Sequence, residues 1–294
     1  MNTGIQEIDN IIGELKTSEL LVIGGDYSIG KTSLLVSLLK NISVENKIPS
    51  TFFNYRDTNQ TLMNRLLSII NKIPFKNFLT SNFTENERMK IFSNYGKIEK
   101  APIFFVDDFS NIKTFEEFKI KCIYSIRQNS SKIIFINDLQ QFHNFLSDNV
   151  SISQTIRNLK STSKELNILI IVSSNITVNG NKAPKLSDFP FYEEIEETSD
   201  IIFLINRPEF YKIYEWDDNY STCVNQAEII IAKNRFGKNS NVKISYNNEY
   251  KYFSNLENIY IHSNSEVVGF EKLNKSFSEV NLNINDDDDE EMPF

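Results

Sequence analysis

The chain has 294 residues, of which 40% are hydrophobic, so it can bury a full core as one large domain or two small ones. Its net charge of −8 comes mainly from six consecutive acids, Asp286–Glu291. Without them 31 basic residues face 33 acidic ones, which is not the basic excess of a non-specific DNA-binding protein. Two distant cysteines, two histidines and the lack of an 18-residue apolar run exclude a structural zinc site and a membrane span, and they predict a reduced, cytoplasmic location.

Short apolar runs alternate with helical patterns along most of the chain. The first run, at residues 19–24, ends in glycine as a buried parallel strand does, and a helical pattern follows over residues 31–43. Further strands are expected at residues 50–54, 103–106, 133–136, 168–172 and 201–205, and further helices at residues 60–70, 115–127 and 151–166. This alternation predicts an α/β fold with a mostly parallel central sheet that helices cover on both faces.

The pattern changes after about residue 208. Antiparallel strands at one edge of the sheet are expected at residues 228–232, 241–246 and 250–253. From about residue 265 the periodicity gives way to Ser, Asn, Glu and Lys, and the last ten residues hold too little apolar surface to offset their ordering entropy. We therefore predict a folded domain over residues 1–264 and a disordered linker and acidic tail over residues 265–294.

A phosphate-binding loop is the strongest motif in the sequence. The segment Gly25-Asp-Tyr-Ser-Ile-Gly-Lys-Thr32 fits the pattern GxxxxGK[ST] and stands between a predicted strand and a predicted helix. Its backbone N–H groups can converge on phosphate oxygens, Lys31 supplies positive charge, and the Thr32 hydroxyl can ligate Mg²⁺. The expected ligand is ATP with Mg²⁺, and the expected binding residues are Gly25, Ser28, Ile29, Gly30, Lys31, Thr32 and Ser33. The alternative is a glycine-containing turn with a chance Lys-Thr pair.

Further segments resemble one protein family in their residues and in their order along the chain. They include residues 3–9, 63–67, 133–140 (Ile133-Ile-Phe-Ile-Asn-Asp-Leu-Gln140), 161–167, 207–211 (Arg207-Pro-Glu-Phe-Tyr211) and 227–235. Over residues 3–255 the chain thus resembles the C-terminal, RecA-like motor domain of DnaB-family replicative helicases. The resemblance implies a P-loop ATPase that acts as a 5′→3′ helicase or translocase on single-stranded DNA. A RecA-like recombinase is a less well matched alternative.

Two basic residues match a pair that acts across a subunit boundary in this family. There, a Lys-x-Arg sequence after a late strand reaches the ATP of the neighbouring subunit, and its arginine acts as the finger. Lys233 and Arg235 stand at these positions, so the resemblance implies a catalytic role in trans. It also implies head-to-tail self-association, with a hexameric ring as one outcome. The alternative is a pair of solvated basic residues at a strand end.

The chain departs from the family at two positions that serve hydrolysis. Arg56 stands where the family has its catalytic glutamate, and Asn137 stands where it has the Walker B aspartate. An arginine cannot accept a proton from water, and an asparagine lacks the charge that holds the shell of a magnesium ion. Asp57 can substitute for the glutamate only if the strand end shifts by one residue, and Asp138 directly follows Asn137. The catalytic candidates within one subunit are therefore Lys31, Asp57 and Asp138, and the candidate metal ligands are Thr32, Asn137 and Asp138. We therefore expect weak hydrolysis.

The residues that would contact DNA are few. Asn175 keeps an amide where the family has glutamine, and Lys182 and Lys185 remain in the loop that follows. The resemblance implies that these three residues bind single-stranded DNA. The family's separate N-terminal domain and linker helix have no counterpart in the sequence, so we expect a standalone motor domain.

The acidic tail ends in Met292, Pro293 and Phe294 and resembles the tip of bacterial single-stranded-DNA-binding proteins. Tails of that kind dock through the terminal aromatic residue and carboxylate, while their acids attract basic residues of the partner. The expected partners are replication or repair proteins that bind such tails; the alternative is a tail that only aids solubility. A rival to the motor is therefore a hydrolysis-deficient, ATP-binding adaptor that recruits replication proteins through this tail.

Overall fold

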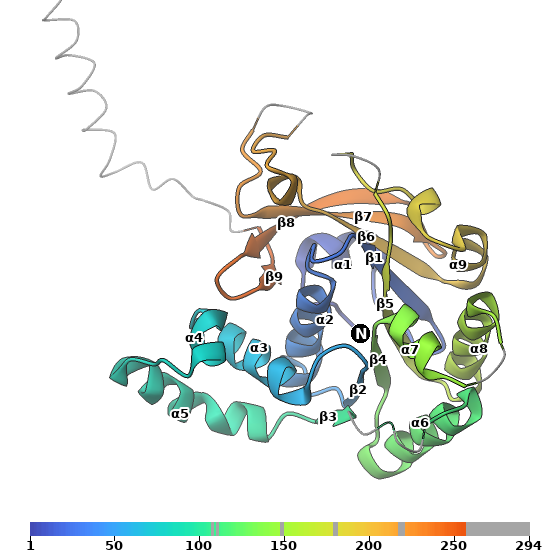
Figure 1. Cartoon of the computed structure of the whole chain (residues 1–294), viewed down its shortest axis with the longest axis horizontal. Helices are drawn as coiled ribbons and strands as arrows, with labels where there is room; N and C mark the ends of the chain where they lie inside the picture. Colours follow the sequence, from blue (N-terminus) through green and yellow to red (C-terminus); the bar gives the residue numbers. More distant parts are fainter. Residues whose placement is uncertain (107–108, 110–111, 148–149, 179–181, 217–220, 257–294) are drawn as a thin grey trace, which may run out of the picture. The chain divides into compact units, whose positions relative to one another are not determined.

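A nine-stranded sheet organises the described part of the structure, a computed structural model that describes residues 1–106, 109, 112–147, 150–178, 182–216 and 221–256. The strands are β1 (Leu20–Gly25), β2 (Ser50–Asn54), β3 (Ile103–Val106), β4 (Ile133–Asn137), β5 (Leu169–Asn175), β6 (Ile201–Asn206), β7 (Gln226–Asn234), β8 (Ser240–Asn247) and β9 (Tyr252–Ser254). Their order in the sheet is β3-β2-β4-β5-β1-β6-β7-β8-β9. The first six strands of this order are parallel, and the last three join antiparallel at one edge (Figure 1). The predicted fold class is confirmed.

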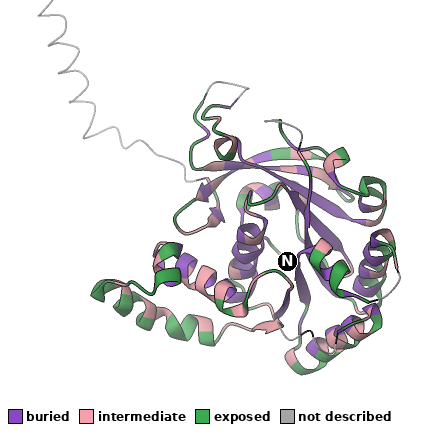
Figure 2. Cartoon of the chain, viewed as in Figure 1, coloured by how far each residue is buried: buried purple, intermediate pink, exposed green. Residues whose placement is uncertain are grey.

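The parallel strands are buried on both faces because helices cover both. Every residue of β1, β2, β4, β5 and β6 is buried, as the continuous apolar runs predicted (Figure 2). Successive side chains of β1 enter opposite layers, so that Leu21 and Ile23 belong to one hydrophobic cluster while Leu20 and Val22 belong to the other.

The helices of the described residues are α1 (Gln6–Ile12), α2 (Lys31–Leu39), α3 (Asn59–Asn71), α4 (Phe75–Thr80), α5 (Glu85–Glu99), α6 (Phe115–Asn129), α7 (Leu139–Phe145), α8 (Ile152–Glu165) and α9 (Tyr192–Thr198). The helix predicted over residues 31–43 ends as an α-helix at Leu39 and continues as a π-helical turn, Lys40–Glu45. Two short 3₁₀ turns lie at Leu186–Asp188 and Pro208–Tyr211. Among the described residues, none of the helices has the length and apolar content that crossing a bilayer requires.

The antiparallel edge follows the alternation seen in the sequence. In β7 the residues Ala227, Ile229 and Ile231 are buried, and the residues between them are half-buried. Phe253 of β9 is fully buried, and its backbone N–H donates to the Ser37 hydroxyl of α2 at 3.0 Å, which holds this edge against α2. The compact unit Met1–Leu256 ends here, and the predicted boundary between residues 264 and 265 lies outside the described residues.

Candidate nucleotide-binding site

The predicted phosphate loop lies at the carboxyl end of β1 and leads into α2. Gly25 is the last residue of β1, and Lys31 is the first of α2. Gly30 has a φ of +123°, a conformation that side chains disfavour, and an added Cβ would lie 3.1 Å from the Phe253 ring. The glycine is therefore required where the loop passes into the helix, and the helix begins with its N–H groups at the loop.

The ammonium group of Lys31 is held beneath this loop. Lys31 is only 4% exposed, and its Nζ donates to the carbonyl oxygens of Gly25 at 2.9 Å and Asp26 at 2.7 Å. Burial, and after it the positive charge of Arg56, lowers the pKa of Lys31 to about 8. A nearby anion stabilises the charged form of a buried cation whose pKa is lowered. The motif predicts that this lysine binds such an anion, a phosphate of the nucleotide.

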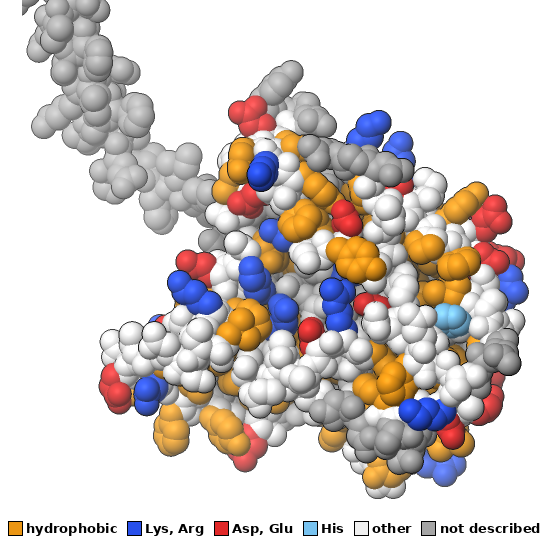
Figure 3. All heavy atoms as spheres, viewed as in Figure 1, with side chains coloured by type: hydrophobic (Ala, Val, Ile, Leu, Met, Phe, Trp, Pro, Cys, Tyr) orange, Lys and Arg blue, Asp and Glu red, His pale blue; other side chains and the backbone are white. Residues whose placement is uncertain are grey.

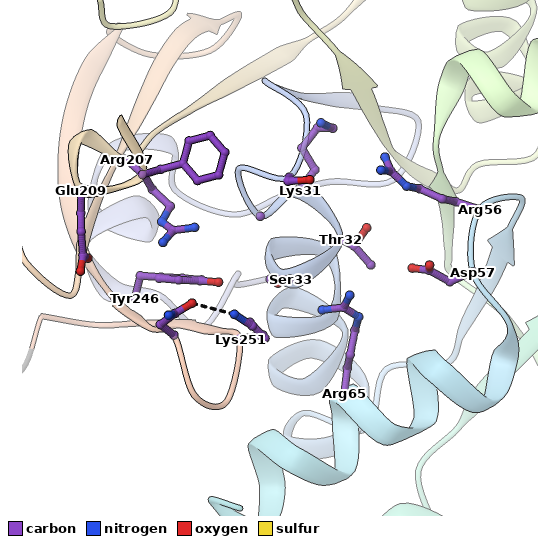
Figure 4. A pocket seen from close by; sticks show the side chains of 14 residues that line it. Lys31, Thr32, Ser33, Arg56, Asp57, Arg65, Arg207, Glu209, Tyr246 and Lys251 are labelled. Carbon is purple, nitrogen blue, oxygen red and sulfur yellow. Dashed lines mark hydrogen bonds between the residues drawn. The ribbon is translucent and has the colours of Figure 1, made fainter. Parts of the chain in front are cut away.

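A cavity of about 470 Å³ opens beside the loop and carries many cations. It is lined by Ser28, Gly30, Lys31, Thr32, Ser33, Arg56, Asp57, Arg65, Arg207, Glu209, Phe210, Tyr246, Asn248 and Lys251 (Figure 4). Lys and Arg side chains also gather near the centre of the face drawn in Figure 3, in the region of α2 and α3. A concave site with this excess of positive charge suits a polyanion such as a nucleotide's phosphates.

One wall of the cavity is built by an arginine that stacks on an aromatic ring. The guanidinium carbon of Arg207 lies 3.7 Å from the ring centroid of Tyr246, and its Nη1 donates to the Ile29 carbonyl at 2.9 Å. Arg207 follows β6 and Tyr246 belongs to β8, so this wall joins the parallel strands to the antiparallel edge. The contact fixes the guanidinium at the mouth of the loop.

The candidate metal ligands form a network that is mostly neutral. The Thr32 hydroxyl donates to Oδ1 of Asn137 at 3.2 Å, and the Ser173 hydroxyl donates to the same oxygen at 3.2 Å. The amide nitrogen of Asn137 donates to Oδ1 of Asn54 at 3.3 Å. The structure therefore brings Thr32 and Asn137 together, and it engages both Oδ1 and Nδ2 of the amide with protein partners.

Asp138, the acid next to Asn137, has its carboxylate engaged elsewhere. It is 1% exposed, its Oδ1 caps α7 by accepting from the N–H of Gln141 at 2.9 Å, and its Oδ2 lies 3.5 Å from Nη1 of Arg56. Nδ2 of Asn175 also lies 3.5 Å from Oδ2. The residues thus fit the phosphates of a nucleotide, whereas the one carboxylate beside Asn137 is paired with an arginine and does not fit a firm magnesium site.

Asp57 lies at the rim of the cavity after β2. Its backbone is held by the Asn54 side chain, whose Oδ1 accepts from the Asp57 N–H at 3.2 Å and whose Nδ2 donates to the Asp57 carbonyl at 2.5 Å. The carboxylate lines the cavity near Arg65 of α3. Asp57 is therefore the acid with the more open approach to the site.

The candidate finger residues lie at the amino ends of the parallel strands, opposite to the carboxyl ends that carry the phosphate loop. Lys233 and Asn234 of β7 pair with Ile202 and Ile201, which begin β6, whereas the phosphate loop follows the carboxyl end of the parallel strand β1. Nη1 of Arg235 lies 2.9 Å from Oδ1 of the buried Asp200, and the ammonium group of Lys233 contacts the Glu196 carbonyl. Neither residue lines the cavity of its own subunit.

The three predicted DNA-binding residues differ in their exposure to solvent. Lys182 and Lys185 are exposed, whereas Asn175 is 7% exposed at the end of β5, with its amide beside Asp138. Gln140 contacts the same strand end, because its Oε1 accepts from the N–H of Asn175 at 3.0 Å. The predicted tail residues Met292, Pro293 and Phe294 lie outside the described residues.

Several lining residues were missed from the sequence. Arg65, Arg207, Tyr246 and Lys251 come from α3, from the segment after β6, from β8 and from the turn before β9, and they meet only through the sheet order. Arg65 and Arg207 stand in segments that carry the family resemblance, which was the available signal. Tyr246 and Lys251 carry no local signal for a binding site.

Residues 1–255 match the family model of the DnaB-like helicase C-terminal domain. The replicative DNA helicase DnaB of Rickettsia felis is 30% identical over 292 residues, which cover 90% of this chain and 59% of the relative. The replicative DNA helicase DnaC of Bacillus subtilis is 27% identical over 263 residues, which cover 87% of this chain and 56% of the relative. The chain spans somewhat more than half the length of these curated relatives.

Two solved structures share the fold. One, described as an ATPase domain, has a TM-score of 0.76 and 25% sequence identity, and the match covers 87% of this chain and 91% of that one. A DnaB-like replicative helicase, described with its interactions with primase, has a TM-score of 0.76 and 25% identity over 87% of this chain and 62% of its own. The chain belongs to the family of DnaB-like helicase C-terminal domains.

Proposed function

We propose that this chain is an ATP-binding motor domain that acts in DNA replication or repair, as a 5′→3′ helicase or translocase on single-stranded DNA with slow ATP hydrolysis. The observation that carries the proposal is the division of the ATPase parts between the two ends of one sheet. Lys31 and its loop lie at the cavity, and Lys233 and Arg235 lie at the opposite end. A site divided in this way is completed only by a second subunit.

This division also supports head-to-tail assembly. The cavity face of one subunit would meet the Arg235 end of the next, which is a heterologous contact that closes into a ring or continues as a helix. A hexamer is the closed form that we propose, by resemblance to the family. The Arg235 side chain is 54% exposed, so its guanidinium is accessible to a neighbouring subunit while Asp200 orients it.

The residues of the site support nucleotide binding more strongly than they support hydrolysis. The loop, the buried Lys31 ammonium and the cationic cavity support binding of ATP, with Mg²⁺ next to Thr32 and Asn137 when the ion accompanies the nucleotide. Hydrolysis needs a group that accepts a proton from water, and Arg56 stands where the family has its glutamate. Asp57 at the rim is the acid that we propose for the residual activity.

Single-stranded DNA is the proposed polymer substrate. The support is the family and the exposed Lys182 and Lys185, which lie outside the cavity and can contact phosphates. One structural relative is described with its interactions with primase, and we extend that class of partner, a replication protein, to this chain.

A second function is favoured by the Arg56–Asp138 ion pair. A protein that binds ATP but hydrolyses it very slowly can act as an adaptor that assembles on DNA and recruits replication proteins through Met292, Pro293 and Phe294. Deletion of Phe294 tests this function by recovery of partners from a bacterial lysate, with nucleotide binding as the control. Recovery of the same proteins by both forms would reduce the tail to a solvated charge run.

Steady-state ATP hydrolysis with and without a single-stranded oligonucleotide tests the motor. We expect a low rate that the oligonucleotide raises and that Lys31→Ala removes. A rate that is unaffected by both the oligonucleotide and Lys31→Ala would contradict the motor function.

A further inference from the structure

The cationic side chains around the phosphate loop indicate how this site neutralises the negative charge of a bound nucleotide. We propose that Arg56 is a direct ligand of the nucleotide's phosphates and takes the place of the magnesium ion, so that ATP binds nearly as tightly without a divalent cation as with one. The proposal rests on the proposed nucleotide site and assigns to it a metal-independent mode of binding.

The first support is the balance of charge in the cavity. Five cationic side chains line it, and they are Lys31, Arg56, Arg65, Arg207 and Lys251; the acids that line it are Asp57 and Glu209. Like charges that are held close together repel each other, and an anion among them removes that repulsion. The cavity therefore supplies the neutralising charge that a triphosphate otherwise takes from a metal ion.

The second support is the fixed position of Arg56. The N–H of Tyr55 donates to the Asn137 carbonyl at 2.9 Å, and Asn54 and Asn137 pair in register, so the ends of β2 and β4 hold this segment. The Arg56 side chain extends from the strand end toward Lys31 (Figure 4). Arg56 and Lys31 both line the cavity beside the phosphate loop, so a phosphate there lies between two cations.

The third support is that the guanidinium can exchange its partner. The Arg56 side chain is 36% exposed, and its contact with the Asp138 carboxylate is a single one at 3.5 Å. Arginine binds phosphate oxygens through two parallel N–H groups, which is a stronger arrangement than one long contact. A phosphate beside Lys31 would therefore draw Arg56 away from Asp138.

The fourth support is the weakness of the metal position. Magnesium in phosphate sites is held by one or two carboxylates together with the phosphates. Here Thr32 and Asn137 are neutral, and Asp138 is shared with Arg56. The ion consequently gains little from the protein.

Calorimetry with a non-hydrolysable ATP analogue tests the proposal, in excess Mg²⁺ and in EDTA. The wild type should show affinities that agree within about threefold, and Arg56→Gln should lose about tenfold or more in EDTA while losing less in Mg²⁺. The double variant Arg56→Glu, Asn137→Asp should bind only with Mg²⁺. Arg127→Gln removes an exposed arginine from the end of α6, outside the cavity, and should behave as the wild type.

Three outcomes would contradict the proposal, and they do not all overturn the same part of it. A wild-type affinity that falls by about tenfold or more in EDTA overturns the role of Arg56 and leaves the nucleotide site intact. No binding under either condition, in protein whose thermal melting shows a folded state, overturns the proposed nucleotide site itself. Equal loss for Arg56→Gln in both buffers would also refute metal replacement.

Discussion

Nη1 of Arg56 lies 3.5 Å from Oδ2 of Asp138, and this ion pair places a cation at the end of β2, beside the phosphate loop. A cation there stabilises bound phosphates but cannot take a proton from an attacking water. We therefore expect tight nucleotide binding and slow hydrolysis to have the same structural cause in this chain.

Restoring acids at the two divergent positions should raise turnover. General-base help contributes roughly 10²–10⁴-fold, so Arg56→Glu combined with Asn137→Asp should increase single-turnover ATP hydrolysis by a large part of that factor in the presence of Mg²⁺. Arg56→Gln is the matched control, because it removes the cation without adding a base. A wild-type rate that equals that of the double variant would identify Asp57 or Asp138 as the working acid.

Nucleotide affinity should depend on pH through Lys31. Its pKa in the free protein is about 8, because burial lowers it first and Arg56 lowers it further, while Asp138 and Asp26 oppose the shift. Phosphate favours the protonated ammonium, so affinity should be highest below pH 8 and should fall above it, by at most about tenfold per pH unit for one proton. Titration calorimetry in buffers of different ionisation enthalpy measures this proton uptake. In Arg56→Gln the decline should begin at a higher pH; an unchanged onset would contradict the coupling.

Complementation between subunits should reveal the role of Arg235. Lys31→Ala and Arg235→Ala should each abolish hydrolysis alone, because one removes the phosphate site and the other the finger. A mixture should recover activity, since an intact Lys31 site can then meet an intact Arg235 of its neighbour. Nucleotide binding should persist in Arg235→Ala. A mixture that gives only the mean of the two inactive variants would contradict action in trans.

The carboxylate that holds Arg235 should also be important for stability. Asp200 is 1% exposed, its Oδ2 lies 2.5 Å from Nζ of Lys160 and accepts from the N–H of Leu20 at 2.8 Å, and its Oδ1 pairs with Arg235. Asp200→Ala leaves the buried Lys160 ammonium without its carboxylate partner. The substitution should therefore lower the free energy of unfolding by roughly 3–5 kcal/mol in urea titrations. Glu116→Ala in the first turn of α6 is the matched exposed control.

The same carboxylate gives a test in acid. Burial alone would raise the pKa of Asp200, but the bonds from Lys160, Leu20 and Arg235 lower it below the ordinary value. Its stabilising contribution is therefore present above the ordinary carboxyl pKa and disappears as the pH falls through the lowered one. The difference between the wild type and Asp200→Ala should shrink there; a constant difference would show that Asp200 acts by packing alone.

Most of the sheet could be predicted from the sequence because buried parallel strands leave continuous apolar runs. All nine predicted strands exist, and β2 and β3 have the predicted bounds. The strand predicted at residues 168–172 instead continues to Asn175, since Ser173 and Ser174 are buried polar residues that end an apolar pattern without ending the strand. Polar burial is invisible to a hydrophobic pattern.

Five helices of the described residues were not predicted, and α5 shows why. Ile91, Tyr95 and Ile98 repeat at helical spacing, but the stripe is narrow and none of the helix's residues is buried. The other local signal is the capping box in which Thr84 and Glu87 bond each other's backbone. α7 is seven residues long and begins after Asp138, which caps it and which the sequence suggests as a catalytic acid and metal ligand, not as a helix cap.

The candidate site was predictable where it is local and not where it is assembled. Gly25–Ser33 form one continuous loop and helix start, so a motif can identify them. The Arg56–Asp138 pair depends on the register between β2 and β4, and the Arg207–Tyr246 stack depends on β6 and β8 lying on either side of β7. Such contacts follow from topology, which a single sequence does not encode locally.

Nucleotide binding at the Gly25–Thr32 loop is the central claim, and calorimetry of ATP binding to the wild type and Lys31→Ala tests it most directly. The wild type should bind one ATP per chain, and Lys31→Ala should bind none, because it loses the buried ammonium that lies against the loop carbonyls. Both proteins should melt at similar temperatures, which shows that the loss is local. Unchanged ATP affinity in Lys31→Ala would contradict the assignment of the site.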